Sequence, residues 1–121
     1  MNQLCQEFLD EFRALSPTLE HAYTDTMCYW QPDLPPVTTL FGALGDQFAR
    51  EFNPGAPEKS VRGFAMIEEA MSSGDEVLLT AVATGVIEAM VSRAVSENTW
   101  PVLRSQFGPS SKAHAETWAS E

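Results

Sequence analysis

Apolar residues recur at intervals of three and four along nearly the whole chain, which is the period of an α-helix. The first such stripe runs from residue 4 to residue 15, opposite acidic positions, and comprises Leu4, Cys5, Phe8, Leu9, Phe12 and Leu15. No segment of useful length alternates apolar and polar residues as a half-buried strand does. The pattern predicts an all-α fold in which residues 1–121 form a single compact domain of six to seven short helices.

Prolines, glycines and capping residues divide this pattern into elements. Ser16 and Pro17 are typical of an N-cap followed by the first helical residue, and this second helix must end before the prolines at 32, 35 and 36. A third stripe runs from Val37 to Phe52. A fourth helix is predicted to start near Pro57 and to bury Val61. The later helices are expected over 76–96, over a short segment from residue 100, and after a cap at Ser110.

The segment 76–96 is the most apolar, so we expect it to be the central helix with the others around it. Its polar residues at fourfold spacing form one narrow line: Thr80, Thr84, Glu88 and Ser92. Gly85 lies beside this line, where a missing side chain lets another backbone approach closely. We expect Glu88 to reach a surface gap or to pair with an arginine such as Arg93 or Arg104. In the alternative interpretation, the polar line forms the floor of a partner-binding surface.

The charge distribution favours a cationic protein partner. The chain carries 17 Asp and Glu against 7 Lys and Arg, a formal net charge of −10, which repels nucleic acid and anionic membranes. Residues 14–49 and 63–92 contain no Lys or Arg. Their acids either pair in the fold with Arg13, Arg50, Arg62 or Arg93, or they form a continuous negative face that suits a basic protein surface.

The sequence carries no recognisable catalytic motif. It has neither a phosphate-binding glycine loop nor an HExxH motif, and His21 and Asp25, four residues apart, lack a third metal ligand nearby. We interpret them as an exposed helix pair and His114 as a packed histidine. The sequence therefore predicts no enzymatic activity, no metal and no cofactor. The alternative is a small ligand-binding or metal-binding protein or enzyme with His21, Asp25 and His114 gathered around a pocket.

The cysteines and the N-terminus favour a cytoplasmic protein. Cys5 and Cys28 lack CxxC spacing and are expected to be small buried hydrophobes in a reducing compartment. The N-terminus has acids in place of the basic region of a signal peptide. The longest apolar run, 77–87, is too short to span a bilayer.

Two surface segments combine features of protein interfaces. The stretch "YTDTMCYWQPDLPP" places aromatic residues beside acids, and "IEEAMSSGDE" forms an acidic corner between two helices. The candidate partner-binding residues are Asp25, Tyr29, Trp30, Asp33, Glu68, Glu69, Asp75 and Glu76. Two alternatives remain open: the two aromatics cap the core, and Asp75 and Glu76 serve the N-terminus of the next helix.

The stretches "ATGVIEAMVSRAVSENTW" and "PVLRSQFGPSSKAHAETW" resemble the C-terminal half of a group of small acidic α-helical bacterial proteins. Some of these act as immunity proteins of polymorphic or secreted toxin systems, and others are uncharacterised helical relatives. "LPPVTTLFGALGDQF" is similar to the group's proline-led third helix, so the resemblance covers about two-thirds of the chain. The matching positions are packing and turn residues: Thr84, Gly85, Glu88, Gly108, Pro109, Ser110 and Trp118. His114 departs from the pattern, because an aromatic residue is expected after the Gly-Pro-Ser turn.

The resemblance implies a bacterial protein that neutralises a cognate toxin by tight binding, either occluding its active site or blocking its substrate. The acidic field would accelerate encounter with a basic toxin domain. A homo-oligomeric helical accessory protein is a further alternative.

Overall fold

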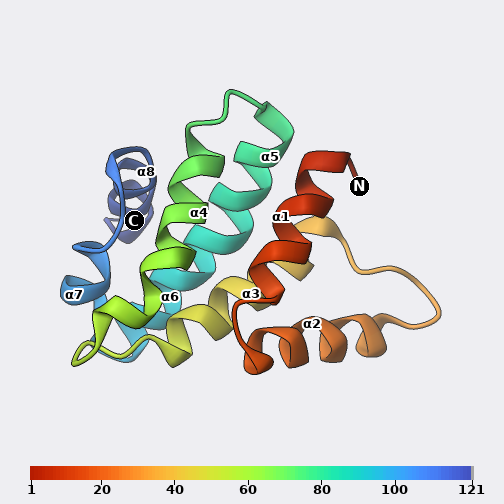
Figure 1. The fold of residues 1–121 in the computed structure, drawn as a ribbon, viewed down its shortest axis with the longest axis horizontal. Helices are drawn as coiled ribbons and strands as arrows, with labels where there is room; N and C mark the ends of the chain where they lie inside the picture. Colours follow the sequence, from red (N-terminus) through yellow and green to blue (C-terminus); the bar gives the residue numbers. More distant parts are fainter. Residues whose placement is uncertain (121) are drawn as a thin grey trace.

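The computed structural model describes residues 1–120, and in these residues every regular element is a helix (Figure 1). The elements are α1 (Gln3–Arg13), α2 (Pro17–Trp30), α3 (Val37–Glu51), the 3-10 helix η1 (Pro57–Ser60), α4 (Val61–Met71), α5 (Glu76–Ala81), the π-helical segment η2 (Val82–Ile87), α6 (Glu88–Ser96), α7 (Trp100–Arg104) and α8 (Pro109–Ala119). Because all of these elements are helices, the predicted all-α fold is confirmed. The elements α5, η2 and α6 form one continuous helix over Glu76–Ser96, which confirms the predicted helix over 76–96.

Side-chain caps fix the starts of α1 and α2 as their sequences require. Asn2 accepts a hydrogen bond from the backbone N–H of Cys5 at the start of α1, over 2.8 Å. Ser16 accepts from the N–H of Leu19 at the start of α2, over 3.1 Å, which confirms the predicted Ser-Pro helix start. Each cap satisfies a backbone donor that has no partner within its own helix.

The continuous helix Glu76–Ser96 lies at the centre of the molecule. It packs against α3 along much of its length and also contacts α1, α4 and α8. Helix α2 lies at the periphery, against α3 and α1, while α7 and α8 lie at the other end of the molecule (Figure 1).

Glycines bring the backbones of α3 and η2 into direct contact. A Cβ atom on Gly45 would lie 2.3 Å from the backbone oxygen of Val86, and one on Gly85 would lie 2.6 Å from the Cβ of Phe41. The expected close approach at Gly85 is therefore present, with Gly45 as its counterpart on α3. Gly42 has more room, because its Cβ would lie 3.8 Å from the nearest atom, the backbone oxygen of Gly85.

A row of phenylalanine rings connects the helices across the core. Phe12 of α1, Phe48 of α3, Phe64 of α4 and Phe107, which precedes α8, follow one another with centroid separations of 5.2 to 5.3 Å. Tilted and edge-to-face rings at this spacing add to the stabilisation from their burial. These four rings therefore extend the core from α1 to the segment that precedes α8.

Two residues expected in the core are exposed. Val61 is 58% exposed because it is the first residue of α4, after a 3-10 turn that starts at Pro57. Cys28 lies on the outer side of α2 and is exposed, whereas Cys5 is buried, as expected. Burial, together with the nearby negative charge of Asp75, raises the pKa of the Cys5 thiol.

The expectation that no segment is long enough to span a bilayer considered only the uninterrupted apolar run 77–87, and the complete central helix is longer than that run. By length and composition Glu76–Ser96 could cross a membrane, with a mean hydropathy of 1.5 over its most apolar window. In the fold, 56% of that window is buried among the other helices, as in the core helix of a soluble protein.

The two α3 glycines give a matched test of the backbone contact. We expect Gly45→Ala to lower the free energy of unfolding by about 2 kcal/mol or more, because its methyl group overlaps backbone atoms of Val86 that cannot rotate away. Gly42→Ala in the same helix should leave stability unchanged or raise it by up to about 1 kcal/mol, since alanine favours the helix. Urea unfolding measured by circular dichroism tests both, and equal stabilities would show that the contact is not tight.

Candidate functional site

The first predicted cluster, at the end of α2 and the loop after it, lies open to solvent. Asp25 and Asp33 are both exposed, and Asp25 pairs with His21 at 3.2 Å as the expected helix pair. Tyr29 is 85% exposed, so it does not cap the core, whereas Trp30 is half-buried. The Tyr29 and Trp30 rings contact each other edge to face with centroids 6.4 Å apart.

Glu68, from the second cluster, connects α4 to α8. Its carboxylate accepts hydrogen bonds from the backbone N–H groups of Ser110 and Ser111, at 3.1 and 2.9 Å, and from the Ser111 hydroxyl at 2.7 Å. This corrects the prediction that Ser110 caps the last helix. The N-cap position is Gly108, without a side-chain cap, and a carboxylate 42 residues earlier in the chain takes that role.

The electrostatics of Glu68 follow from this geometry. Partial burial raises the pKa of its carboxyl, but the hydrogen bonds from Ser111 and Ser110 outweigh it and hold the pKa below its ordinary value. The positive end of α8 favours the ionised form in the same direction. Glu68 therefore has a structural role in holding the C-terminal helix.

The other three residues of the second cluster lie in different surroundings and do not form one surface. Asp75 is the N-cap of α5 and accepts from the N–H of Leu78 at 2.9 Å, which confirms the alternative given for it. Glu76 is exposed in the first turn of α5 and borders a shallow hollow beside Thr80. Glu69 is exposed on the outer side of α4 and lines a groove.

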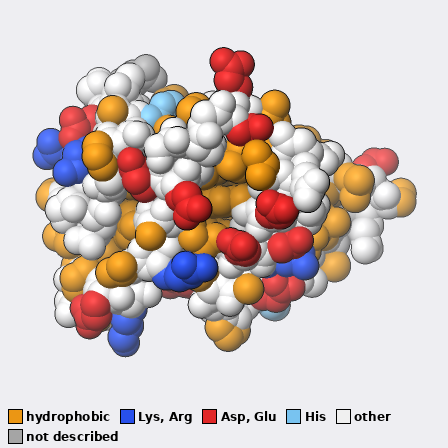
Figure 2. All heavy atoms as spheres, turned by 45° about the horizontal axis from the view of Figure 1, so that its top comes forward, with side chains coloured by type: hydrophobic (Ala, Val, Ile, Leu, Met, Phe, Trp, Pro, Cys, Tyr) orange, Lys and Arg blue, Asp and Glu red, His pale blue; other side chains and the backbone are white. Residues whose placement is uncertain are grey.

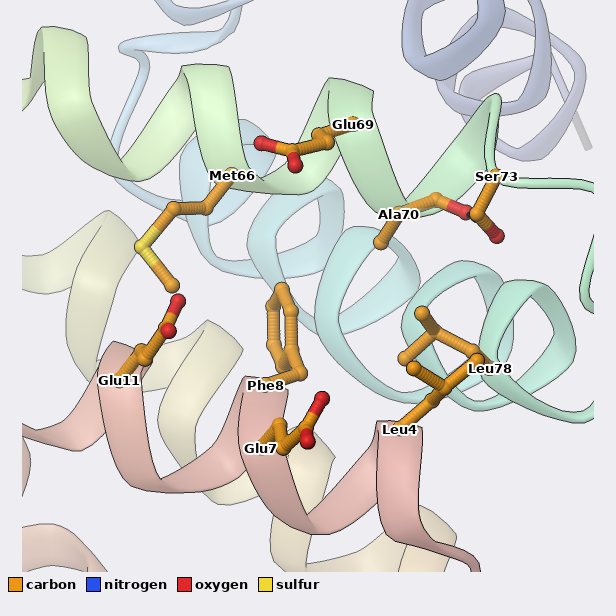
Figure 3. A pocket seen from close by; sticks show the side chains of 9 residues that line it. All are labelled: Leu4, Glu7, Phe8, Glu11, Met66, Glu69, Ala70, Ser73 and Leu78. Carbon is orange, nitrogen blue, oxygen red and sulfur yellow. Dashed lines mark hydrogen bonds between the residues drawn. The ribbon is translucent and has the colours of Figure 1, made fainter.

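This groove runs between α1 on one side and α4 with the start of α5 on the other (Figure 3). Its volume is about 250 Å³. The lining residues are Leu4, Glu7, Phe8, Glu11, Met66, Glu69, Ala70, Ser73 and Leu78. Phe8, Met66 and Leu78 point into the groove from three helices, and Leu4 and Leu78 lie together at one end, while Glu7, Glu11 and Glu69 stand around the apolar floor (Figure 3).

Three of the four arginines expected as counter-ions pair outside this groove, and the fourth, Arg62, is exposed and forms no ion pair within residues 1–120. Arg13 pairs with Asp10 at 3.6 Å and Glu20 at 3.4 Å, and Arg50 and Arg93 both pair with Asp46, at 3.4 and 2.8 Å. Within residues 1–120, the three groove glutamates form no ion pair, and Glu7 is bonded only to the neutral amide of Gln3. Figure 2 shows a face on which several carboxylates, together with a few basic side chains, border exposed hydrophobic atoms. We name the surface formed by the nine lining residues the acidic groove.

The sequence did not indicate Glu7 and Glu11 as binding residues, because they lie opposite the apolar stripe of α1 and were interpreted as part of its solvent face. Their spacing carried a signal, since they stand three and seven residues after Leu4 and so share its flank of the helix. Leu4 itself is 42% exposed, which leaves an apolar group beside these acids at the edge of the stripe.

Helix α8 contacts the second half of the polar line of the central helix. Glu88 pairs with His114 at 2.9 Å, and the indole Nε1 of Trp118 donates to the Ser92 hydroxyl at 3.4 Å. The expected partners of Glu88 were arginines, so this pairing is a correction. Because Glu88 is half-buried and bonded to His114, it is not the floor of an open binding surface, whereas Ser92 remains exposed.

The histidines do not gather in one pocket. His21 and Asp25 border a hollow between α2 and α3 together with Asp46 and Arg50, with a volume of about 570 Å³, whereas His114 lies on α8 against Glu88. Among residues 1–120, no group of three or more His, Cys, Asp or Glu side chains is placed to hold a metal ion.

Neighbouring glutamates of α4 provide a test of the Glu68 contact. We expect Glu68→Gln to lower the free energy of unfolding by about 1–2 kcal/mol at pH 7, because it removes charge from three hydrogen bonds at the start of α8. The lowered pKa in the folded state means that this stabilisation is full above the ordinary glutamate pKa of 4.5 and is lost as the pH falls through the folded-state value.

Urea unfolding at pH 7 and pH 3.5 should therefore show that the difference in free energy of unfolding between wild type and Glu68→Gln is smaller at pH 3.5. Glu69→Gln is the matched control, since Glu69 is exposed and adjacent, and it should change stability by less than about 0.5 kcal/mol. A stability difference between wild type and Glu68→Gln that does not change with pH would contradict a role for the ionised carboxylate in this contact.

Comparison with known proteins assigns the chain to a protein family. No curated protein and no solved structure matches the chain. A family model described as "Domain of unknown function (DUF7674)" matches residues 5–119, from the first buried position of α1 to the last residue of α8. The match includes α1 from Cys5 onward, α4 and α5, and therefore nearly the whole fold and every residue of the acidic groove except Leu4. This chain belongs to the family described as Domain of unknown function (DUF7674).

Proposed function

We propose that this protein is a bacterial cytoplasmic immunity protein that binds and neutralises a cognate toxin domain with a basic surface. The observation that carries the proposal is the acidic groove, where three glutamates without ion-pair partners in residues 1–120 border an apolar floor that ends at the exposed side chain of Leu4. An apolar centre with charges of one sign around it is typical of a surface that selects a partner of opposite charge. The resemblance of the sequence to acidic helical immunity proteins gives this partner its class.

The overall charge supports the same kind of partner. The formal net charge of −10 produces a field that attracts a basic protein before contact and so accelerates association. Neutralising a toxin requires rapid and tight binding, and both follow from steering by surface acids combined with burial of apolar anchors. The mechanism requires neither a catalytic group nor a cofactor.

A stable interface needs more area than the groove alone provides. A standard protein complex buries about 800 Å² on each partner, against a total accessible surface of 6511 Å² here. Tyr29, an exposed aromatic side chain in the last turn of α2, is a suitable second anchor. We therefore include the acids and aromatics at the end of α2 and in the loop after it in the proposed contact surface.

Co-expression tests the proposal. We expect the chain to relieve the growth defect caused by the product of the adjacent gene and to co-purify with that product as a stable complex. Because surface charges steer the encounter, the association rate constant measured by stopped flow should fall at least about tenfold between 0.05 and 0.5 M salt.

An unrelated acidic helical protein of similar net charge is the control that separates specific binding from bulk charge. It should neither protect the cells nor co-purify. Absence of both protection and a complex for this chain would refute the immunity function.

A further inference from the structure

We propose that the acidic groove binds a cationic amphipathic helix of the partner protein, with the apolar side chains of that helix on the groove floor and its Lys or Arg residues against Glu7, Glu11 and Glu69. This inference rests on the proposed function, since it specifies which part of the partner is bound. It is argued from three properties of the groove: its apolar floor, its dimensions and the placement of its charges.

The floor is apolar and held firmly from beneath. Phe8 stacks on Phe12 and Phe41, with centroid distances of 5.1 and 5.6 Å, so its ring is fixed by the core. Met66, on the opposite wall, has a flexible side chain that adapts to the shape of an inserted group. Leu4, at the open end, is 42% exposed and would lose contact with water when the groove is filled.

The dimensions select side chains of a helix over the helix itself. From Leu4 to Glu11, α1 makes two turns, or about 10 Å at 1.5 Å per residue. A volume of about 250 Å³ admits a few side chains, but not a helix about 10 Å across. A helix lying over the groove would therefore insert residues at positions i, i+3 or i+4, and i+7, the spacing used when helices bind in grooves.

The charges select a cationic occupant. Glu7 and Glu11 stand on the α1 side and Glu69 on the α4 side, so carboxylates border the floor from both walls (Figure 3). No Lys, Arg or His is among the nine lining residues. A helix with an apolar stripe between two rows of Lys or Arg satisfies both walls, whereas an anionic helix or an anionic lipid surface meets like charge.

A synthetic peptide provides a direct probe. The probe is a fluorescein-labelled peptide of about 18 residues, built from leucine and lysine so that leucine forms one helical stripe. The reference peptide has the same composition in an order without an apolar stripe. Fluorescence anisotropy with the full chain should give a Kd at least about tenfold lower for the amphipathic peptide.

Two pairs of variants assign this binding to the groove. The variant Glu7→Gln, Glu11→Gln, Glu69→Gln should weaken binding about tenfold. The control variant Glu58→Gln, Glu97→Gln, Glu116→Gln changes the net charge equally outside the groove and should weaken binding less than about threefold. Leu4→Ser should weaken binding about threefold or more, whereas Val95→Ser, which replaces an exposed apolar residue of α6, should not.

Chemical-shift mapping of the wild-type chain needs no variant. The largest amide shifts on adding the amphipathic peptide should fall in residues 4–11, 66–73 and 78. The inference is overturned by equal binding of the two peptides, by equal losses in the two triple variants, or by shifts centred elsewhere.

The same variants separate this inference from the immunity function. If the chain protects cells and the groove triple variant protects them equally well, the immunity function holds and the groove is not its site. If the peptide binds in the groove but the chain neither protects nor forms a complex, the groove is a helix-binding site and the immunity function is wrong.

Discussion

The fold depends on the contact between α3 and the π-helical turn of the central helix. Gly45 and Gly85 remove the two side chains that would separate these backbones, since a Cβ at either position would overlap its neighbour. At that separation Phe41, beside Gly85, is fully buried and lies against Phe8 of α1. The position of α1 therefore follows from the packing of α3 on the central helix, and so does the floor of the acidic groove.

The acids of this chain fall into two groups with different consequences for stability. Glu68 and Asp75 accept hydrogen bonds from backbone N–H groups at the starts of α8 and α5, Asp46 pairs with two arginines, and all three acids stabilise the folded state. The glutamates of the acidic groove have no such partners in residues 1–120 and contribute only negative potential. Arg13, Arg50 and Arg93 pair with acids outside the groove, and within residues 1–120 no arginine or lysine forms an ion pair with the groove glutamates.

The helices were predictable from the sequence because their signals are local. Apolar spacing, the Ser16–Pro17 start and the breaks after residues 52 and 72 each depend on a few neighbouring residues, and the structure has a helix in each place. The site was less predictable because it depends on pairs far apart in the sequence. Glu68 meets Ser111 across 43 positions and Glu88 meets His114 across 26, so neither partner follows from periodicity. Of the eight predicted binding residues only Glu69 lines the acidic groove, and its partners on α1 were interpreted as a solvent face.

The charges of the groove are difficult to explain by folding alone. Glu7 and Glu11 are like charges four residues apart on one helix, an arrangement that destabilises a helix by a few tenths of a kcal/mol. A lysine at position 11 would instead form a favourable pair with Glu7, in the better of the two orientations. The wall opposite adds a third carboxylate, and Leu4, on the same wall as Glu7 and Glu11, remains 42% exposed. A cationic amphipathic helix would compensate the charge and cover the apolar floor in one step, so the proposed binding would account for an arrangement that opposes stability.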